Sequence, residues 1–172
     1  MVRALTELTG DPGRIHEEGM AARVALEQAR EQVAALLGAR SREVVFTSGA
    51  TESIAAAVFG AADRAAGKGV ADAEGRTHQV VTAVEHSAVR FSAERAGSVT
   101  VVPVDRHGRV DADEVLAAIT PATAAVHVQW GNHEVGTLQP VEAVVAGCRE
   151  RGVLVHIDAA QAVGRLPIAF DD

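Results

Sequence analysis

The segment at residues 47–53 combines side chains and backbone suited to bind a phosphate group. Here an apolar run gives way to a helical pattern through Ser48, Gly49, Ala50 and Thr51. The glycine lets backbone amides converge, and the start of a helix adds positive potential, so an anion is stabilised there. The hydroxyl of Thr51 adds a donor. The residues leave open the alternative that Thr47 or Ser48 only caps the helix.

A second candidate group lies near the end of the chain. Asp158 directly follows an apolar run, so its carboxylate is expected in a largely dehydrated position. A buried carboxylate needs a cationic partner or several donors, and a protonated pyridine nitrogen is such a partner. This pair would keep a pyridine ring an electron sink, while Gln161 could donate to a ring oxygen. The alternatives are a helix-capping aspartate and a solvated glutamine.

Histidine and cysteine are the remaining residue types that could do chemistry. His86 ends an apolar run, where its flat ring could stack on an aromatic cofactor or pass protons, or be structural. His156 lies inside an expected strand and is assigned to packing. Cys148 lies within an expected helix and is interpreted as a small buried side chain rather than a nucleophile. Surface or structural roles are expected for the other histidines: His16, His78, His107 and His127.

Alternating apolar runs and helical patterns predict the elements that position these residues. Helices are expected over residues 15–37, 50–66, 87–96, 111–119 and 141–151, and strands over 43–47, 79–84, 99–104, 123–130 and 153–157. The strands are apolar on both faces, as when helices cover both sides of a mostly parallel sheet. We therefore predict one α/β domain over residues 1–172, with three α/β/α layers. Ligands bind at the carboxyl ends of such strands, where the polar residues lie.

Three local signals refine these elements. Helix 15–37 has Met20, Val24, Val33 and Leu37 spaced for one buried face. An aspartate caps helix 111–119, and the polar segment 67–77 is expected to be a surface loop.

Composition excludes several classes of protein. With 172 residues, 48% of them hydrophobic and 23% charged, the chain is typical of one folded globular domain. A formal charge of −7 argues against a protein whose main function is to bind nucleic acid. The single cysteine allows no disulfide within the chain and no four-cysteine zinc site, so no metal is predicted and a cytoplasmic setting is expected. No apolar run is long enough for a secretory signal or a membrane span, so no membrane association is expected.

Four segments resemble the cysteine desulfurases, which stand with the selenocysteine lyases in the class V aminotransferase branch of fold-type I pyridoxal-phosphate (PLP) enzymes. The segments are 44–53 (VVFTSGATES), 85–89 (EHSAV), 132–137 (NHEVGT) and 156–168 (HIDAAQAVGRLPI). Their order and spacing fit the family across nearly the whole chain from Asp11 onward. The resemblance implies a truncated large domain of that fold, with PLP as the cofactor.

The resemblance also implies roles for individual residues. Ala50 and Thr51 would hold the PLP phosphate, and His86 would stack on the ring and assist proton transfer. Asp158 would pair with the pyridine nitrogen, and Gln161 would bond the ring hydroxyl.

One site position departs from the family pattern. The family usually places an asparagine directly before the residue that matches Glu134, where this chain has His133. Asn132 lies one residue earlier, so the ring contact is left open between Asn132 and His133.

Other family features are not matched within the sequence, which ends at Asp172. These are the Schiff-base lysine in its Ser-x-His-Lys stretch, the persulfide-forming cysteine, the small C-terminal domain and the N-terminal Ala-Thr-Thr-Pro motif. Lys68, the only lysine, is expected in a solvated loop away from the cofactor. Because covalent PLP catalysis needs an amine, the chain alone is expected to be inactive.

The sequence thus leads to two classes of function. The first is the PLP-binding half of a split enzyme that takes sulfur from cysteine, or performs a related transamination or elimination on a small amino acid. A complementary chain would supply the lysine and the C-terminal domain, in a hetero-oligomer or dimer. The second is a non-catalytic binding module or truncated fragment with the same fold.

Overall fold

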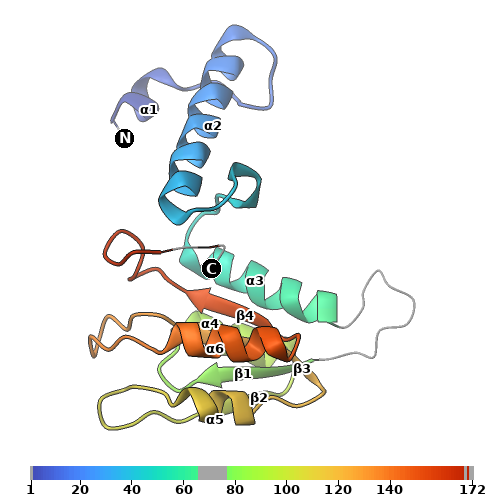
Figure 1. Ribbon diagram of the computed structural model, residues 1–172. Helices are drawn as coiled ribbons and strands as arrows, with labels where there is room; N and C mark the ends of the chain where they lie inside the picture. The colour runs from blue at the N-terminus through green and yellow to red at the C-terminus, as the bar shows by residue number, and fades with distance from the viewer. Residues whose placement is uncertain (1, 66–76, 169, 171–172) are drawn as a thin grey trace. The chain divides into compact units, whose positions relative to one another are not determined.

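The computed structural model describes residues 2–65, 77–168 and 170 (Figure 1). It contains two compact units, residues 1–46 with 163–172 and residues 47–162, each considered by itself. The single domain expected over residues 1–172 stays a prediction. Lys68 and most of the expected loop 67–77 lie outside the described residues.

The larger unit, 47–162, is built on four parallel strands in the order β2-β1-β3-β4. Its strands are β1 (His78–Thr82), β2 (Val99–Val102), β3 (Thr123–Gln129) and β4 (Leu154–Asp158). Its helices are α3 (Ala50–Ala65), α4 (Ser87–Ala96), α5 (Ala112–Ala117) and α6 (Val141–Glu150). The predicted α/β fold with a parallel sheet is therefore confirmed, with element ends within a few residues of those expected.

Helices cover both faces of this sheet. Neighbouring residues of a strand point to opposite faces, so each packs against different helices. Val81 packs in one buried cluster with residues of α3 and α4, among them Val58 and Val89. Val80 packs in a second cluster with residues of α5 and α6, among them Val115 and Val144. In Figure 1, α6 crosses the front of the sheet and α4 lies behind it. This layering explains why the strands are apolar on both faces.

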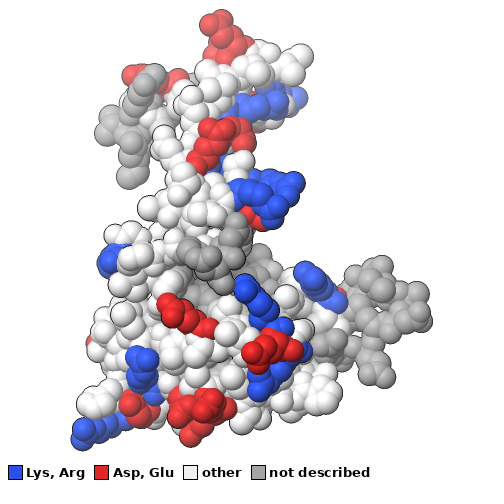
Figure 2. Space-filling view, in the orientation of Figure 1, with Lys and Arg blue, Asp and Glu red and all other residues white. Residues whose placement is uncertain are grey.

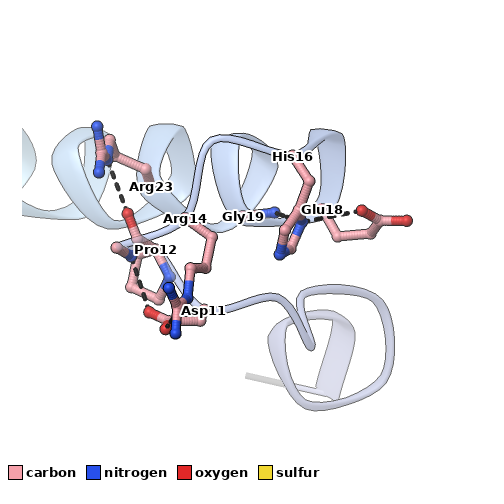
Figure 3. A network of polar contacts seen from close by, with 8 residues as sticks. Asp11, Pro12, Arg14, His16, Glu18, Gly19 and Arg23 are labelled. Carbon is pink, nitrogen blue, oxygen red and sulfur yellow. Dashed lines mark hydrogen bonds and ion pairs between the residues drawn. The ribbon is translucent and has the colours of Figure 1, made fainter.

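The smaller unit contains α1 (Val2–Glu7), α2 (Glu17–Leu37) and the 3-10 helix η1 (Ser41–Glu43). The start of α2 is held by polar contacts (Figure 3). The His16 ring accepts a hydrogen bond from the Gly19 amide at 3.2 Å, and the Arg23 guanidinium donates to the Pro12 carbonyl at 2.7 Å. A Cβ on Gly19 would lie 2.7 Å from the Asp11 carbonyl oxygen, so only glycine lets the preceding loop pass this closely.

Two predictions for the smaller unit are wrong. Met20 and Val24 are exposed, so they do not form the expected buried face of α2, in which Gly19 and Ala34 are buried instead. The expected strand 43–47 is also absent from this described part of the chain. Val44 is extended, but its carbonyl accepts from the Arg30 guanidinium, and Val45 is exposed. An apolar run forms a strand only where another strand pairs with it.

The surface mixes charges of both signs. On the face shown in Figure 2, arginine side chains lie next to acidic ones. Across the helices that the structure describes, none has both the length and the apolar character required to cross a lipid bilayer.

Candidate functional site

The predicted site residues lie in the larger unit, at or after the carboxyl ends of its strands or at the start of α3. Since β1, β3 and β4 are neighbouring parallel strands, their carboxyl ends share one edge of the sheet. We call this edge the rim and define it by the residues that end or follow these strands: Glu85, His86, Gln129, Asn132, His133, Asp158 and Gln161.

Asp158 is the last residue of β4 and is only 8% exposed. Its carboxylate accepts a hydrogen bond from the Ala160 amide at 3.1 Å, and its backbone oxygen accepts from the Trp130 amide at 2.9 Å. The segment after it is a turn, so Asp158 does not cap a helix. The dehydrated carboxylate expected from the sequence is confirmed, and a cation would be its natural partner.

Glu85 is a second buried carboxyl at the rim, and the sequence did not single out its side chain. It is 7% exposed, and its Oε1 accepts from the Thr82 hydroxyl and from the Gln129 amide, both at 2.6 Å. Burial raises the pKa of Glu85 to about 7, assisted by the negative charge of Asp158 and opposed by these two hydrogen bonds. Only its position before His86 marked it in the sequence, because burial of a glutamate has no local signal.

Asn132 is fully engaged with the protein. Its Nδ2 donates to the Val84 carbonyl at 3.1 Å and to the Gln129 side chain at 3.0 Å. Its Oδ1 accepts from the amides of Glu134 and Val135, at 2.8 and 3.0 Å. These four bonds fasten the loop after β3 to the segment after β1, so the amide group organises the loop.

His133, the alternative ring contact, presents an exposed side chain. Half of it (50%) is accessible, and its Nε2 lies 4.0 Å from the Glu134 carboxylate. Its ring is therefore far more accessible to a ligand than the amide of Asn132.

His86 caps α4 with its side chain. The ring is exposed, and its Nδ1 accepts a hydrogen bond from the Ala88 amide at 3.1 Å. Because Nδ1 is the acceptor, a neutral ring carries its proton on Nε2. The cap thus fixes both the place of the ring and the nitrogen that is free to donate.

The start of α3 shows how the segment 47–53 is organised. Glu52 accepts from the amide and the hydroxyl of Ser48, at 2.7 and 2.5 Å, and the hydroxyl bond is the larger cause that lowers the pKa of Glu52. Ala50 and Thr51 are exposed, and the Thr51 hydroxyl has no partner among the residues with described positions. A carboxylate rather than a hydroxyl therefore holds the Ser48 amide, while Thr51 is open to a ligand.

Gln161 lies beside the loop that follows β3. A Cβ on Gly131 would be 3.9 Å from the Cβ of Gln161, whose residue is exposed. This places Gln161 next to the segment that carries Asn132 and His133.

A buried histidine pair crosses the sheet below the rim. His127 Nε2 lies 2.9 Å from the Gln79 side-chain oxygen, and His127 Nδ1 lies 3.2 Å from His156 Nδ1. If Gln79 accepts, His127 donates from Nε2 and His156 must donate from Nδ1. Burial, with His156 as a smaller cause, lowers the pKa of His127 to about 3. The pair is structural, as expected for His127, and is uncharged at neutral pH.

Cys148 is fully buried on α6, as expected, and burial raises the pKa of its thiol to about 11. We therefore expect the folded chain to react with an aromatic disulfide reagent at least about 100-fold more slowly than the unfolded chain, from its thiolate fraction alone. Colour release with and without denaturant at one pH measures this. Equal rates would show that Cys148 is accessible.

Known proteins share this fold and sequence. The family model for Aminotransferase class-V matches residues 1–172. The chain is 41% identical to a cysteine desulfurase IscS from Neisseria meningitidis, with 98% of this chain and 41% of that protein covered. It is 40% identical to a mitosomal cysteine desulfurase from Trachipleistophora hominis, covering 98% of this chain and 38% of that protein. The chain thus spans about two fifths of the length of these relatives.

Solved structures of related proteins have the same fold as this chain. A structure titled NifS-like protein superposes with a TM-score of 0.88 at 32% identity, covering 99% of this chain and 47% of that one. DndA from Streptomyces lividans gives a TM-score of 0.83 at 32% identity, covering 96% of this chain and 46% of that one. The four resembling segments, the parallel sheet and the full-length family match lead to one conclusion: the chain belongs to the class V aminotransferase family, whose enzymes depend on PLP.

Proposed function

We propose that the chain is the PLP-binding part of a cysteine desulfurase-like enzyme that mobilises sulfur from cysteine. The observation that carries the proposal is the buried carboxylate of Asp158, which ends β4 and accepts one side-chain hydrogen bond, from Ala160. A buried anion at the ligand-binding edge of a parallel sheet is suited to a ring cation. The identity to cysteine desulfurases supports the choice of reaction.

The residue types at the rim and at the start of α3 are those that would hold PLP. Ala50 and Thr51 would hold the phosphate at the helix start, where the Thr51 hydroxyl is open. Asp158 would pair with the ring nitrogen, and Gln161 would donate to the ring hydroxyl. PLP, when bound, supplies an electron sink for the amino-acid substrate. His86 would stack on the ring and hold a proton on Nε2, since its Nδ1 is occupied by Ala88.

We assign the remaining ring contact to His133 rather than Asn132, because all four hydrogen bonds of the Asn132 amide go to the protein. Asn132→Ala is expected to lower the free energy of unfolding by about 1–3 kcal/mol, since the buried Gln129 side chain and the part-buried Val84 carbonyl lose their donor. His133→Ala should change it by less than about 0.5 kcal/mol, as exposed positions do, and weaken PLP binding.

Urea unfolding and PLP titration of both variants test this assignment. If His133→Ala binds PLP as tightly as the parent chain, His133 does not contact the ring. If Asn132→Ala unfolds at the parent's urea concentration, Asn132 does not organise the loop.

We further propose that the covalent anchor and the C-terminal domain come from polypeptide outside these 172 residues, supplied by a complementary chain in a hetero-oligomer. None of the four segments that resemble the cysteine desulfurases contains a lysine. A PLP enzyme of this class needs an amine for covalent catalysis. We also propose a cytoplasmic setting, which is the expectation from the single cysteine.

The experiment compares the chain alone with the chain mixed with its neighbouring gene product, each with added PLP. The expected result is visible absorbance of lysine-bound PLP and cysteine-dependent sulfide release in the mixture only. Transfer of an amino group, or elimination without sulfide, would assign another class V reaction. If no mixture yields either signal, the chain is a binding module with the desulfurase fold.

A further inference from the structure

The Glu85 carboxyl has one oxygen without a hydrogen-bond partner. Oε2 is buried and unpaired in the part of the chain that the structure describes. Buried polar atoms are nearly always hydrogen-bonded, so an ionised oxygen with nothing to accept from would be costly here. A protonated Oε2 removes most of that cost, because the neutral carboxyl is much cheaper to bury.

Glu85 also joins two strand ends. The last register pair between β1 and β3 is Val81 with His127, and the Gln129 amide lies beyond it. The Glu85 Oε1 accepts from that amide at 2.6 Å, so its side chain continues the contact between β1 and β3 up to the rim. Oε1 can accept whether or not Oε2 carries a proton. Protonation therefore leaves this connection intact.

Asp158 is the charged neighbour of Glu85. Gln129 on β3 is in register with Asp158 on β4, and its amide donates to Glu85, which follows β1, so the two residues lie on opposite sides of β3. The groups bonded to Glu85, the Thr82 hydroxyl and the Gln129 amide, are neutral, and Asp158 is the ionisable group that acts on it electrostatically. His86 adjoins Glu85 in the sequence, but its exposed ring is engaged at the start of α4. The negative charge of Asp158 therefore adds to burial in disfavouring the ionised form of Glu85.

We propose that Glu85 is a positioning residue that holds a proton on Oε2 and so leaves Asp158 as the single buried anion of the rim. A ring cation would then meet one carboxylate of full charge, with a neutral carboxyl beside it that fixes the strand ends. The role of this arrangement in binding a ring cation rests on the proposed function. The protonation itself is a property of the chain without PLP.

Nuclear magnetic resonance of the PLP-free chain, labelled with ¹³C and ¹⁵N, tests the proposal. The carboxyl carbon shift of Glu85, assigned through backbone connectivity, is followed from about pH 5 to about pH 9. The expected midpoint is near pH 7 in the parent chain. In Asp158→Asn the midpoint should fall, since the neighbouring negative charge is gone, but it should stay above the ordinary glutamate value, because burial is the largest cause of the raised pKa. The matched control Asp113→Asn, on exposed α5 surface, should keep the parent midpoint.

Two results would overturn the proposal. A parent midpoint below about pH 5 would show an ordinary ionised carboxylate with a structural role only. An equal midpoint in Asp158→Asn would show that Glu85 is not coupled to Asp158. The parent titration needs no variant, so it decides the first question even if Asp158→Asn fails to fold. Failure of the chain to bind PLP would remove the proposed function and leave this titration unchanged, so the two failures are distinguishable.

Discussion

Replacing Asp158 with alanine is expected to weaken PLP binding to the chain by roughly 30-fold to several-thousand-fold. The reason is that truncating one partner of a buried charge pair costs about 2–5 kcal/mol. Asp158 is nearly inaccessible at the end of β4, so water cannot replace its carboxylate opposite a ring cation. The measurement is equilibrium titration of the purified chain with PLP, followed by absorbance.

Two comparisons make this result specific to the site. Asp113→Ala removes a carboxylate from the exposed surface of α5 and should bind PLP like the parent chain. Far-ultraviolet circular dichroism should show that Asp158→Ala keeps its secondary structure, since among the described residues the Asp158 side chain accepts one hydrogen bond, from the Ala160 amide. A folded Asp158→Ala with parental PLP affinity would contradict the placement of the ring.

His127 is expected to make the fold sensitive to acid. Its pKa is lowered from 6.5 to about 3 by burial, so the unfolded chain takes up a proton below pH 6.5 that the folded chain refuses. The stability that this contributes is therefore fully present above pH 6.5 and is lost as the pH falls towards 3. The loss is about 1.4 kcal/mol per pH unit and about 5 kcal/mol in full. The pKa of His156 is also lowered by burial, so His156 acts in the same direction.

Glu85 acts in the opposite direction over nearly the same range. Its pKa is raised from 4.5 to about 7, so the folded chain keeps a proton that the unfolded chain releases. Its contribution is present below pH 4.5 and is lost as the pH rises to about 7, by about 3 kcal/mol. The parent chain alone therefore shows a flattened pH dependence, and the effect of His127 must be read from a difference between variants.

The comparison is between the parent chain and His127→Gln, with exposed His107→Gln as the matched control. Because Glu85 is common to all three, its contribution cancels in the differences. The stability advantage of the parent over His127→Gln should shrink by about 2 kcal/mol between pH 8 and pH 5 in urea unfolding. His107→Gln should show the same change in the free energy of unfolding between pH 8 and pH 5 as the parent chain. An advantage that stays constant with pH would show that His127 is not held neutral by the fold.

The sequence by itself determined the alternation of helices and strands, the parallel sheet and the positions of the site residues along it. These follow from short-range patterns, because side-chain periodicity and caps depend on residues a few positions apart. Asp111 caps α5 as predicted, and Asp158 ends an apolar strand. Their environments could be foreseen from neighbours in the chain.

Tertiary structure alone decided which polar groups are buried together. Glu85 bonds to the Gln129 amide, Asn132 bonds to the Val84 carbonyl, and His127 bonds to Gln79, all across more than 40 residues of chain. The same reason explains why the expected strand 43–47 does not form: its sequence is apolar, but no strand of the described residues pairs with it. Burial and pairing depend on contacts between distant segments, and no local pattern in the sequence records them.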